Sequence, residues 1–206
     1  MTRAAVLASA LTLLGLSHCA GQLAGKAGAF SRMGFGARGI GMGNALTAVT
    51  TGDLAGYYNP AAMALLARRT LSASYGLLAL DRRLNFVSYA QPLPPSAGLS
   101  AGIINAGVSG IDGRDADGEE TGLLQTSENQ IFLAFANRFR GGLCVGLNVK
   151  LYHHRLYTDV SSTTVGFDAG ALLPLPHGLA AGLTVRDINS RYTWDTSELY
   201  CQDGNT

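Results

Sequence analysis

The chain has 206 residues and a formal net charge of +1, with 14% charged and 47% hydrophobic residues. A typical soluble domain has about 25% charged residues, and no window here holds the roughly eighteen uninterrupted apolar residues of a spanning helix. The balanced charge gives no reason to expect nucleic acid as a partner. Low charge with 27 glycines is unusual for a soluble enzyme but ordinary for a membrane β-barrel, whose apolar residues alternate with a polar face.

Residues 1–20 are predicted to be an export signal peptide. Arg3 gives a positive start, and residues 4–16 form an apolar stretch that is too short to span a bilayer. Cleavage is expected near residues 19–21. Cys19 raises the alternative of a lipoprotein signal, but such a signal prefers small residues before the cysteine, and His18 is not small.

Two cysteines remain after the signal peptide. An exported protein permits a disulfide. Cys144 lies in a strand pattern and Cys201 in a polar tail, so we do not expect a bridge between them.

A glycine-rich segment, residues 21–66, precedes the first regular alternation. Within it, residues 34–39 read GFGARG and fit the dinucleotide-binding pattern G-x-G-x-x-G, and Asp53 follows at the required distance. That fingerprint needs a buried strand before it and a helix after it. Residues 21–33 are rich in Gly and Ala and contain no run of Val or Ile, so the nucleotide interpretation is disfavoured.

From residue 70 onward, hydrophobicity alternates with a period of two. In residues 142–157, the odd positions from Leu143 to Leu151 are aliphatic, and the even positions carry Cys, Gly, Asn, Lys and Tyr. Successive side chains of a strand point to opposite faces, and the stretch is long enough to span a membrane when tilted. Similar patterns predict about seven strands, at residues 70–80, 83–92, 97–108, 128–139, 142–157, 163–173 and 178–190.

The connections between these strands are predicted to differ at the two ends. Residues 92–97, 139–142 and 174–178 contain Pro and Gly and indicate tight turns, whereas residues 109–127 are long and acidic. Outer-membrane barrels have short periplasmic turns and longer outer loops. Residues 109–127 are therefore expected to form a loop at the cell surface. Its acidic residues suggest a calcium site as an alternative, but they lack the spacing of an EF-hand, and a solvated loop is favoured.

No constellation of residues predicts an enzyme, a metal site or a cofactor. His153 and His154 are adjacent, so in a strand they point to opposite faces and cannot share a metal. The sequence has no G-x-S-x-G motif. Three charges are more informative, because Lys150, Asp168 and Arg186 fall on the polar face of three consecutive predicted strands. Charges in a membrane-embedded structure should face the interior and pair, so we expect a ladder that braces the wall or, as the alternative, lines a path.

Residues 27–66 resemble the N-terminal signature of the PorV/PorQ family of bacterial outer-membrane proteins, and are more distantly similar to FadL-type transporters. The segment that starts at residue 163 and ends in the stretch VRDINSRYTWDT also looks like a late strand pair of that family. The matching positions are a G-x-G-A-R block, a G-M-G block and an N-P-A motif, and the residues expected to matter in them are Gly34, Gly36, Arg38, Gly39, Gly41, Gly43, Asn59 and Pro60.

The resemblance implies an antiparallel transmembrane β-barrel of about fourteen strands, with residues 21–66 as a hatch near or inside its mouth. Glycines there would let the backbone approach the strand wall or adopt positive φ, whereas a flexible linker would rarely carry the interleaved large apolar residues. Arg38 is expected to bond to lumen carbonyls or carboxylates, or else to face solvent. Residues 67–206 supply only about seven strands, so we expect the chain to be the N-terminal half of a longer barrel.

The implied function is non-enzymatic, in the outer membrane of a diderm bacterium. PorV-like proteins act in type IX secretion, where they receive exported substrates by their C-terminal signal domains and pass them to the attachment machinery. The expected partners are therefore outer-membrane lipid, secreted proteins and other secretion components. The alternative is a FadL-like transporter of hydrophobic small molecules, and a structural β-protein of the periplasm or cell surface is the weakest interpretation.

Overall fold

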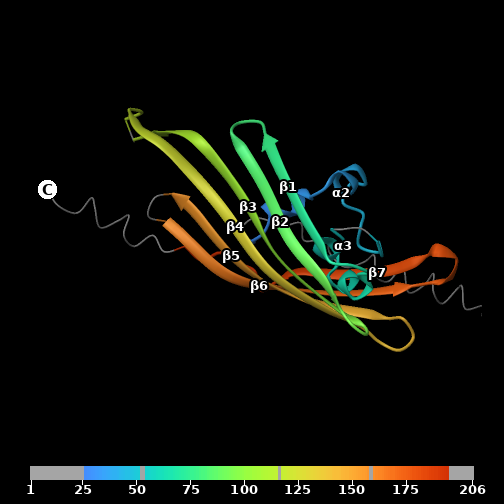
Figure 1. Cartoon of the computed structure of the whole chain (residues 1–206). Helices are drawn as coiled ribbons and strands as arrows, with labels where there is room; N and C mark the ends of the chain where they lie inside the picture. Colours follow the sequence, from blue (N-terminus) through green and yellow to red (C-terminus); the bar gives the residue numbers. More distant parts are fainter. Residues whose placement is uncertain (1–25, 52–53, 116, 158–159, 195–206) are drawn as a thin grey trace, which may run out of the picture.

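The fold comes from a computed structural model that describes residues 26–51, 54–115, 117–157 and 160–194. The predicted signal peptide, Asp53 and Cys201 lie outside the described residues. The described chain begins with a segment of short helices, residues 26–66, which we call the hatch segment, and continues as one antiparallel sheet (Figure 1).

Seven strands form this sheet, and each pairs with its neighbours in the sequence. They are β1 (Thr70–Leu78), β2 (Arg82–Leu93), β3 (Ala97–Arg114), β4 (Glu120–Arg138), β5 (Cys144–Tyr157), β6 (Val160–Pro174) and β7 (Ala180–Ile188). The prediction of an all-β antiparallel architecture is therefore confirmed. β1 and β7 are the two edges, and the described residues do not close the sheet into a barrel.

The predicted contrast between short turns and long loops is wrong, because no two consecutive strands are separated by more than five residues. Most of residues 109–127 belongs to β3 and β4, whose pairing continues through a register shift to Arg114 opposite Glu120. The result is a hairpin that projects beyond its neighbours (Figure 1). Residues at its tip are polar on both faces, because a strand that extends past the packed part of a sheet needs no apolar face. The composition of such a strand resembles that of a loop.

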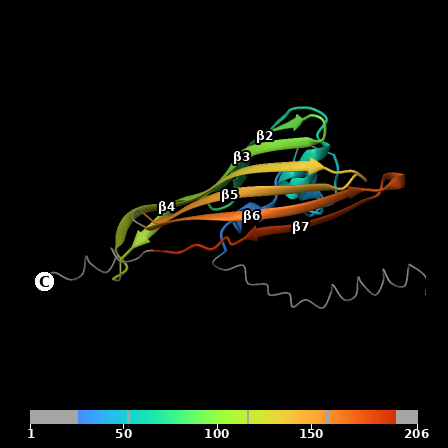
Figure 2. The same cartoon turned by 90° about the horizontal axis from the view of Figure 1, so that it is seen from below.

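Four short helices of the hatch segment lie against one face of the sheet, which we call the inner face (Figures 1 and 2). They are η1 (Phe30–Met33), α2 (Ala37–Gly41), α3 (Ala55–Tyr58) and η2 (Pro60–Leu65), and a further turn, η3 (Pro176–Gly178), joins β6 to β7. Of these, η2 contacts every strand from β2 to β6. Within the described ranges, no helix has both the length and the apolar character to cross a membrane.

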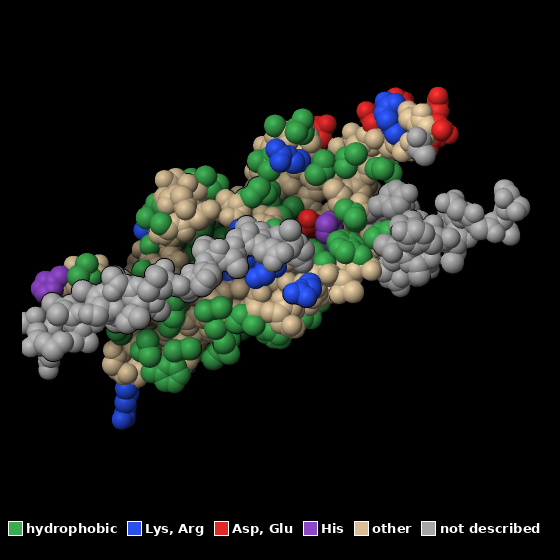
Figure 3. All heavy atoms as spheres, turned by 180° about the vertical axis from the view of Figure 1, so that it is seen from behind, with side chains coloured by type: hydrophobic (Ala, Val, Ile, Leu, Met, Phe, Trp, Pro, Cys, Tyr) green, Lys and Arg blue, Asp and Glu red, His purple; other side chains and the backbone are tan. Residues whose placement is uncertain are grey.

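The two faces of the sheet are buried in the opposite sense to those of a water-soluble sheet. On β5, the apolar Leu147 and Val149 of the outer face are 62% and 47% exposed, whereas Asn148 and Lys150 of the inner face are 4% and 6% exposed. Apolar side chains cover much of the described surface in Figure 3, and acidic ones gather at the tip of the projecting hairpin. Other strands repeat the pattern, with exposed outer residues that include Leu71, Tyr75, Leu133, Phe135, Phe167 and Leu183.

Candidate functional site

The Asn59-Pro60-Ala61 turn holds the hatch segment against the sheet. Asn59 Oδ1 accepts a hydrogen bond from the Ala61 N–H at 3.0 Å, which caps η2, and Pro60 occupies its first turn. Asn59 Nδ2 donates to the carbonyl oxygens of Thr47 at 2.8 Å and of Ala171 on β6 at 3.1 Å. One buried amide therefore joins two parts of the hatch segment to the strand wall.

Glycines of the wall provide the space for this contact. A Cβ at Gly146 of β5 would lie 2.4 Å from the Pro60 carbonyl carbon, and one at Gly170 of β6 would lie 2.1 Å from Asn59 Oδ1. A Cβ at Gly98 of β3 would lie 2.0 Å from the Met63 carbonyl oxygen. These separations are far below van der Waals contact, so glycine is required at each position.

The glycines predicted to matter in the hatch segment serve different purposes. Three of them adopt the positive φ that favours glycine: Gly34 (89°), Gly36 (74°) and Gly43 (59°). A Cβ at Gly39 would lie 2.0 Å from the hydroxyl of Tyr58, whereas Gly41 has no neighbour within 4 Å of that position. The G-x-G-x-x-G stretch follows the helix η1 rather than a strand, so the structure does not provide the context of a dinucleotide loop.

Arg38 is exposed on α2 and donates from Nη1 to the Thr51 carbonyl oxygen at 3.0 Å. Its partner therefore belongs to the hatch segment itself, and not to the wall. This contact ties the start of α2 to the chain that follows it, so the side chain stabilises the local turn while it remains in contact with solvent.

Two of the three charges predicted on the polar face form a buried ion pair. Lys150 Nζ lies 2.7 Å from Asp168 Oδ2 on β6, and it lies 3.0 Å from Asp187 Oδ1 on β7. Asp168 also accepts from Asn148 Nδ2 at 3.2 Å. The side chains of Lys150, Asp168 and Asp187 are at most 7% exposed, and removal of one partner from such a site costs about 3–5 kcal/mol.

Asp187 links this ion pair to the hatch segment. Arg32 of η1 donates to Asp187 Oδ2 from Nη2 at 2.6 Å and from Nε at 3.1 Å. The Tyr152 hydroxyl donates to Asp187 Oδ1 at 2.6 Å. We call Arg32, Lys150, Asp168 and Asp187 the charge cluster. It contains two positive and two negative side chains, so its charges balance, with the Arg32 side chain 33% exposed.

A β-bulge on β7 explains how Asp187 reaches this position. The register shifts between Phe167 opposite Ile188 and Ala169 opposite Val185, so two residues of β7 lie opposite one of β6. Asp187 has a φ of 55°, and its N–H donates to Asp168 Oδ1 at 2.9 Å. The extra residue directs consecutive charged side chains toward the hatch segment, as bulges near functional sites commonly do.

Arg186, the third predicted charge, does not join the charge cluster. Its Nη2 donates to the carbonyl oxygens of Tyr57 and Tyr58 in α3. The guanidinium carbon lies 5.5 Å from the centre of the Tyr57 ring and 5.8 Å from that of Tyr58, within the range of a cation–π contact. Arg186 therefore fixes the hatch segment at a second place on β7.

An aromatic cluster fills the space between α3 and the strands. Tyr57 packs edge-on against Phe35 at 5.1 Å, and Phe35 stacks on Phe86 of β2 at 4.9 Å. The Tyr57 hydroxyl donates to the Ser31 carbonyl oxygen. Burial raises the pKa of the Tyr57 phenol above its usual range, although the Arg186 charge opposes the effect. The phenol is therefore neutral at physiological pH.

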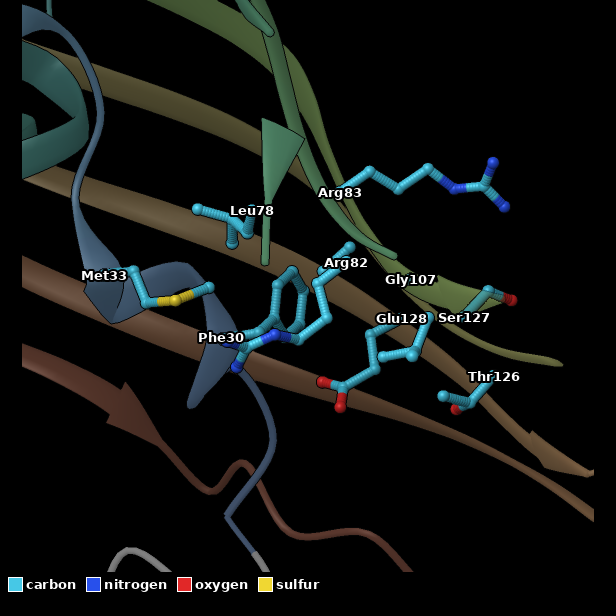
Figure 4. A pocket seen from close by; sticks show the side chains of 11 residues that line it. Phe30, Met33, Leu78, Arg82, Arg83, Gly107, Thr126, Ser127 and Glu128 are labelled. Atoms are coloured by element: carbon cyan, nitrogen blue, oxygen red, sulfur yellow. The ribbon is translucent and has the colours of Figure 1, made fainter. Parts of the chain in front are cut away.

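A cavity of about 150 Å³ lies beside η1, between the hatch segment and the strands β1 to β4. Phe30 and Met33 line it from the hatch segment, and Leu78 lines it from β1 (Figure 4). Arg82 and the Glu128 carboxylate add charge to this mostly apolar lining, whereas the neighbouring Arg83 points away from it in Figure 4.

The two adjacent histidines lie on opposite sides of β5. His153 is exposed and its Nδ1 lies 2.9 Å from Thr163 Oγ1, whereas His154 is half-buried with Nε2 at 3.6 Å from Glu128 Oε1. No group of three or more potential metal ligands is present in the part of the chain that the structure describes. At the hairpin tip, the Asp115 carboxylate instead accepts the backbone N–H groups of Asp117 and Glu119.

Sequence reasoning missed two members of the charge cluster. Asp187 lies next to Arg186, so strict alternation assigns it to the opposite face. The bulge that brings both side chains to the inner face leaves no unambiguous signal in the sequence. Arg32 precedes the glycine blocks, and no pattern relates it to a strand 155 residues away.

No protein-family model, curated protein or solved structure matches the chain.

Proposed function

We propose that the protein is a non-enzymatic outer-membrane β-barrel whose interior is closed by the hatch segment. The observation that carries this proposal is the burial pattern of the strands, with apolar side chains exposed outside and ionised side chains buried inside. Exposure of apolar surface to water costs about 25 cal/mol per Å². A wall that faces lipid, by contrast, requires an apolar surface. The signal peptide expected over residues 1–20 supports export.

A closed barrel requires partners for both edges of the sheet. In lipid, the unpaired N–H and C=O groups of β1 and β7 would each cost several kcal/mol, so each edge would pair with a further strand. The family resemblance implies about fourteen strands in total. The described strands contain 9 to 19 residues, which approaches or exceeds the roughly nine to eleven residues needed to span a tilted path through the bilayer.

We further propose that this barrel is a PorV-like component of type IX protein secretion and surface attachment. The resemblance of residues 27–66 supports this role. The contacts of the hatch segment support a closed docking component over an open conduit, because the N-P-A turn, the charge cluster and Arg186 hold the segment against strands from β2 to β7. The partners would be exported proteins and the secretion components that attach them to the surface.

Deletion of the gene in its own bacterium tests the secretion role. We expect exported proteins with the C-terminal signal domain to accumulate in the periplasm and to lose surface attachment, and complementation with the wild-type gene to restore it. Outer-membrane fractionation of the complemented strain is the control for localisation. Unchanged surface attachment in the deletion strain would contradict the secretion role but leave the barrel itself intact.

The cavity beside η1 favours the alternative of a FadL-like transporter. Its lining by Phe30, Met33 and Leu78 suits a small hydrophobic molecule at the boundary between the hatch segment and the wall. Under this alternative, Phe30→Ala would reduce uptake of a hydrophobic compound by intact cells, and deletion of the gene would leave surface attachment of secreted proteins unaffected. The two functions are thus separated by the same deletion strain.

A further inference from the structure

Exposed charges differ between the two ends of the sheet. The end that contains the β2–β3, β4–β5 and β6–β7 turns and the residues before β1 carries five exposed basic side chains. We call this set the basic rim, and it comprises Arg68, Arg69, Arg138, Arg140 and His177. Among the described residues, no acidic side chain lies in these turns, and none of the four arginines forms an ion pair. Over the described part of the chain, the basic rim therefore presents positive charge without acidic partners.

The opposite end of the sheet has mixed charge. Arg82 and Arg83 there follow Asp81, and the projecting hairpin carries Asp115 and Glu120 near Arg114. Arg114 Nη2 lies 3.0 Å from Glu120 Oε1. Figure 3 shows acidic side chains at this end, whereas the coloured ionisable side chains visible at the other end of the described surface are Lys, Arg or His.

Exposed apolar side chains are interleaved with the basic rim. Phe139 lies between two of its arginines and is 54% exposed, and Leu71, which follows Arg69 by two residues, is 76% exposed. Leu179, after the β6–β7 turn, is 65% exposed. Apolar and aromatic side chains beside arginines are typical of the boundary between hydrocarbon and headgroups. An acidic polypeptide bound to the arginines would leave these apolar side chains in water, whereas a lipid would cover both.

We infer that the basic rim binds the phosphate headgroups of anionic phospholipids in the leaflet that surrounds the turn end. This inference rests on the proposed insertion of the sheet in a membrane, and it names the class of lipid that the turn end would bind. Guanidinium groups bind phosphate through paired hydrogen bonds. Each arginine near an anionic bilayer surface raises the binding constant about fivefold.

Spin-labelled lipids test this inference with the complete gene product in vesicles. The protein is reconstituted in phosphatidylcholine, and electron paramagnetic resonance measures the association of labelled phosphatidylglycerol relative to labelled phosphatidylcholine. We expect a preference for phosphatidylglycerol of about fivefold at low salt, which disappears at about 1 M salt because the screening length falls to about 3 Å. The variant R68Q/R69Q/R140Q should lose the preference.

The variant R82Q/R83Q/R155Q is the matched control, because it removes three exposed arginines from the opposite end. It should retain the preference for phosphatidylglycerol. An inserted protein with no preference, or an equal loss in both variants, would overturn the inference while the barrel stands. Binding of soluble polyglutamate in place of phosphatidylglycerol would overturn it in favour of an acidic polypeptide. Failure to insert in vesicles of either composition would instead overturn the proposed barrel.

Discussion

The outer and inner faces of the same strands share a two-residue period but differ in how their side chains are packed. On the outer face, large apolar residues would be interchangeable in the proposed membrane setting, because lipid adapts to any apolar shape. On the inner face, individual residues meet individual partners: Gly98 meets Met63, and Lys150 meets Asp168 and Asp187. Alternation therefore identifies two faces, but only the contacts show that the polar face is the packed one.

The largest difference between the faces should follow from Lys150→Ala. This change leaves two carboxylates buried without their shared cation, and the free energy of unfolding should fall by about 3–5 kcal/mol. Urea titration of the protein in lipid vesicles measures it. The control is Val149→Ala on the outer face, which should cost only about 1–2 kcal/mol, since lipid fills the space of the lost methyl groups. Equal losses would mean that the two faces are not distinct.

A charge placed on the outer face should be nearly as disruptive. Val149→Arg puts a guanidinium near the middle of β5, and it should destabilise the inserted protein by about 2–4 kcal/mol. Leu175→Arg, in the β6–β7 turn, should cost only about 0–1 kcal/mol, because the proposed insertion places this turn at the membrane interface. Urea titration in the same vesicles compares them, and a similar small cost at both positions would argue that Val149 faces water.

The glycine contacts of the inner face give a smaller effect that is specific to the hatch segment. Gly98→Ala forces a methyl group against the Met63 carbonyl, at a cost of about 1–3 kcal/mol. We expect the hatch segment to detach more often, so trypsin should cleave after Arg38 faster than in the wild type. Gly41→Ala meets no atom within 4 Å and should leave the cleavage rate unchanged. Equal rates in both variants would show that Gly98 does not hold the hatch segment.

The smallest expected effect is that of Tyr57→Phe, which removes the hydrogen bond to the Ser31 carbonyl and should cost about 1 kcal/mol at neutral pH. Because burial raises the Tyr57 pKa, the folded state favours the neutral phenol. This contribution is complete below the ordinary tyrosine pKa of 10.0 and is lost as the pH rises above it. Urea titrations at rising pH should therefore show the wild type losing its advantage over the variant, and a constant difference would contradict the assignment.

The strands could be predicted from the sequence because their period of two is a local property. Leu143 to Leu151 alternate without interruption, and β5 includes almost all of this stretch. The prediction failed for residues 109–127, where polar residues occupy both faces near the tip of a real hairpin. Strand formation there depends on pairing between β3 and β4, which a local pattern does not record.

The candidate site could be predicted only in part, because its contacts join residues that are distant in sequence. Lys150 and Asp168 could be paired, since alternation places them on the same face of neighbouring strands, and the register sets them one diagonal step apart. Alternation predicts Arg186 on the inner face but does not identify its partners, which are hatch carbonyls. A bulge hides Asp187 from the same pattern. The glycines of the wall, such as Gly146 and Gly170, gave no sign that they receive the N-P-A turn.

Spin labels along β5 test the central claim most directly. Single cysteines replace residues 145, 147, 148, 149, 151 and 152 in turn, with the native cysteines changed to serine. Gly146 and Lys150 stay unchanged, because a side chain at 146 would collide with Pro60 and Lys150 forms the buried ion pair. Each label is exposed to oxygen, which concentrates in lipid, and to a water-soluble nickel complex. Labels at the odd positions, such as Leu147 and Val149, should respond to oxygen and not to nickel, and labels at the even positions should respond weakly to both. Strong response to nickel at the odd positions would show that the apolar face lies in water and would contradict the barrel.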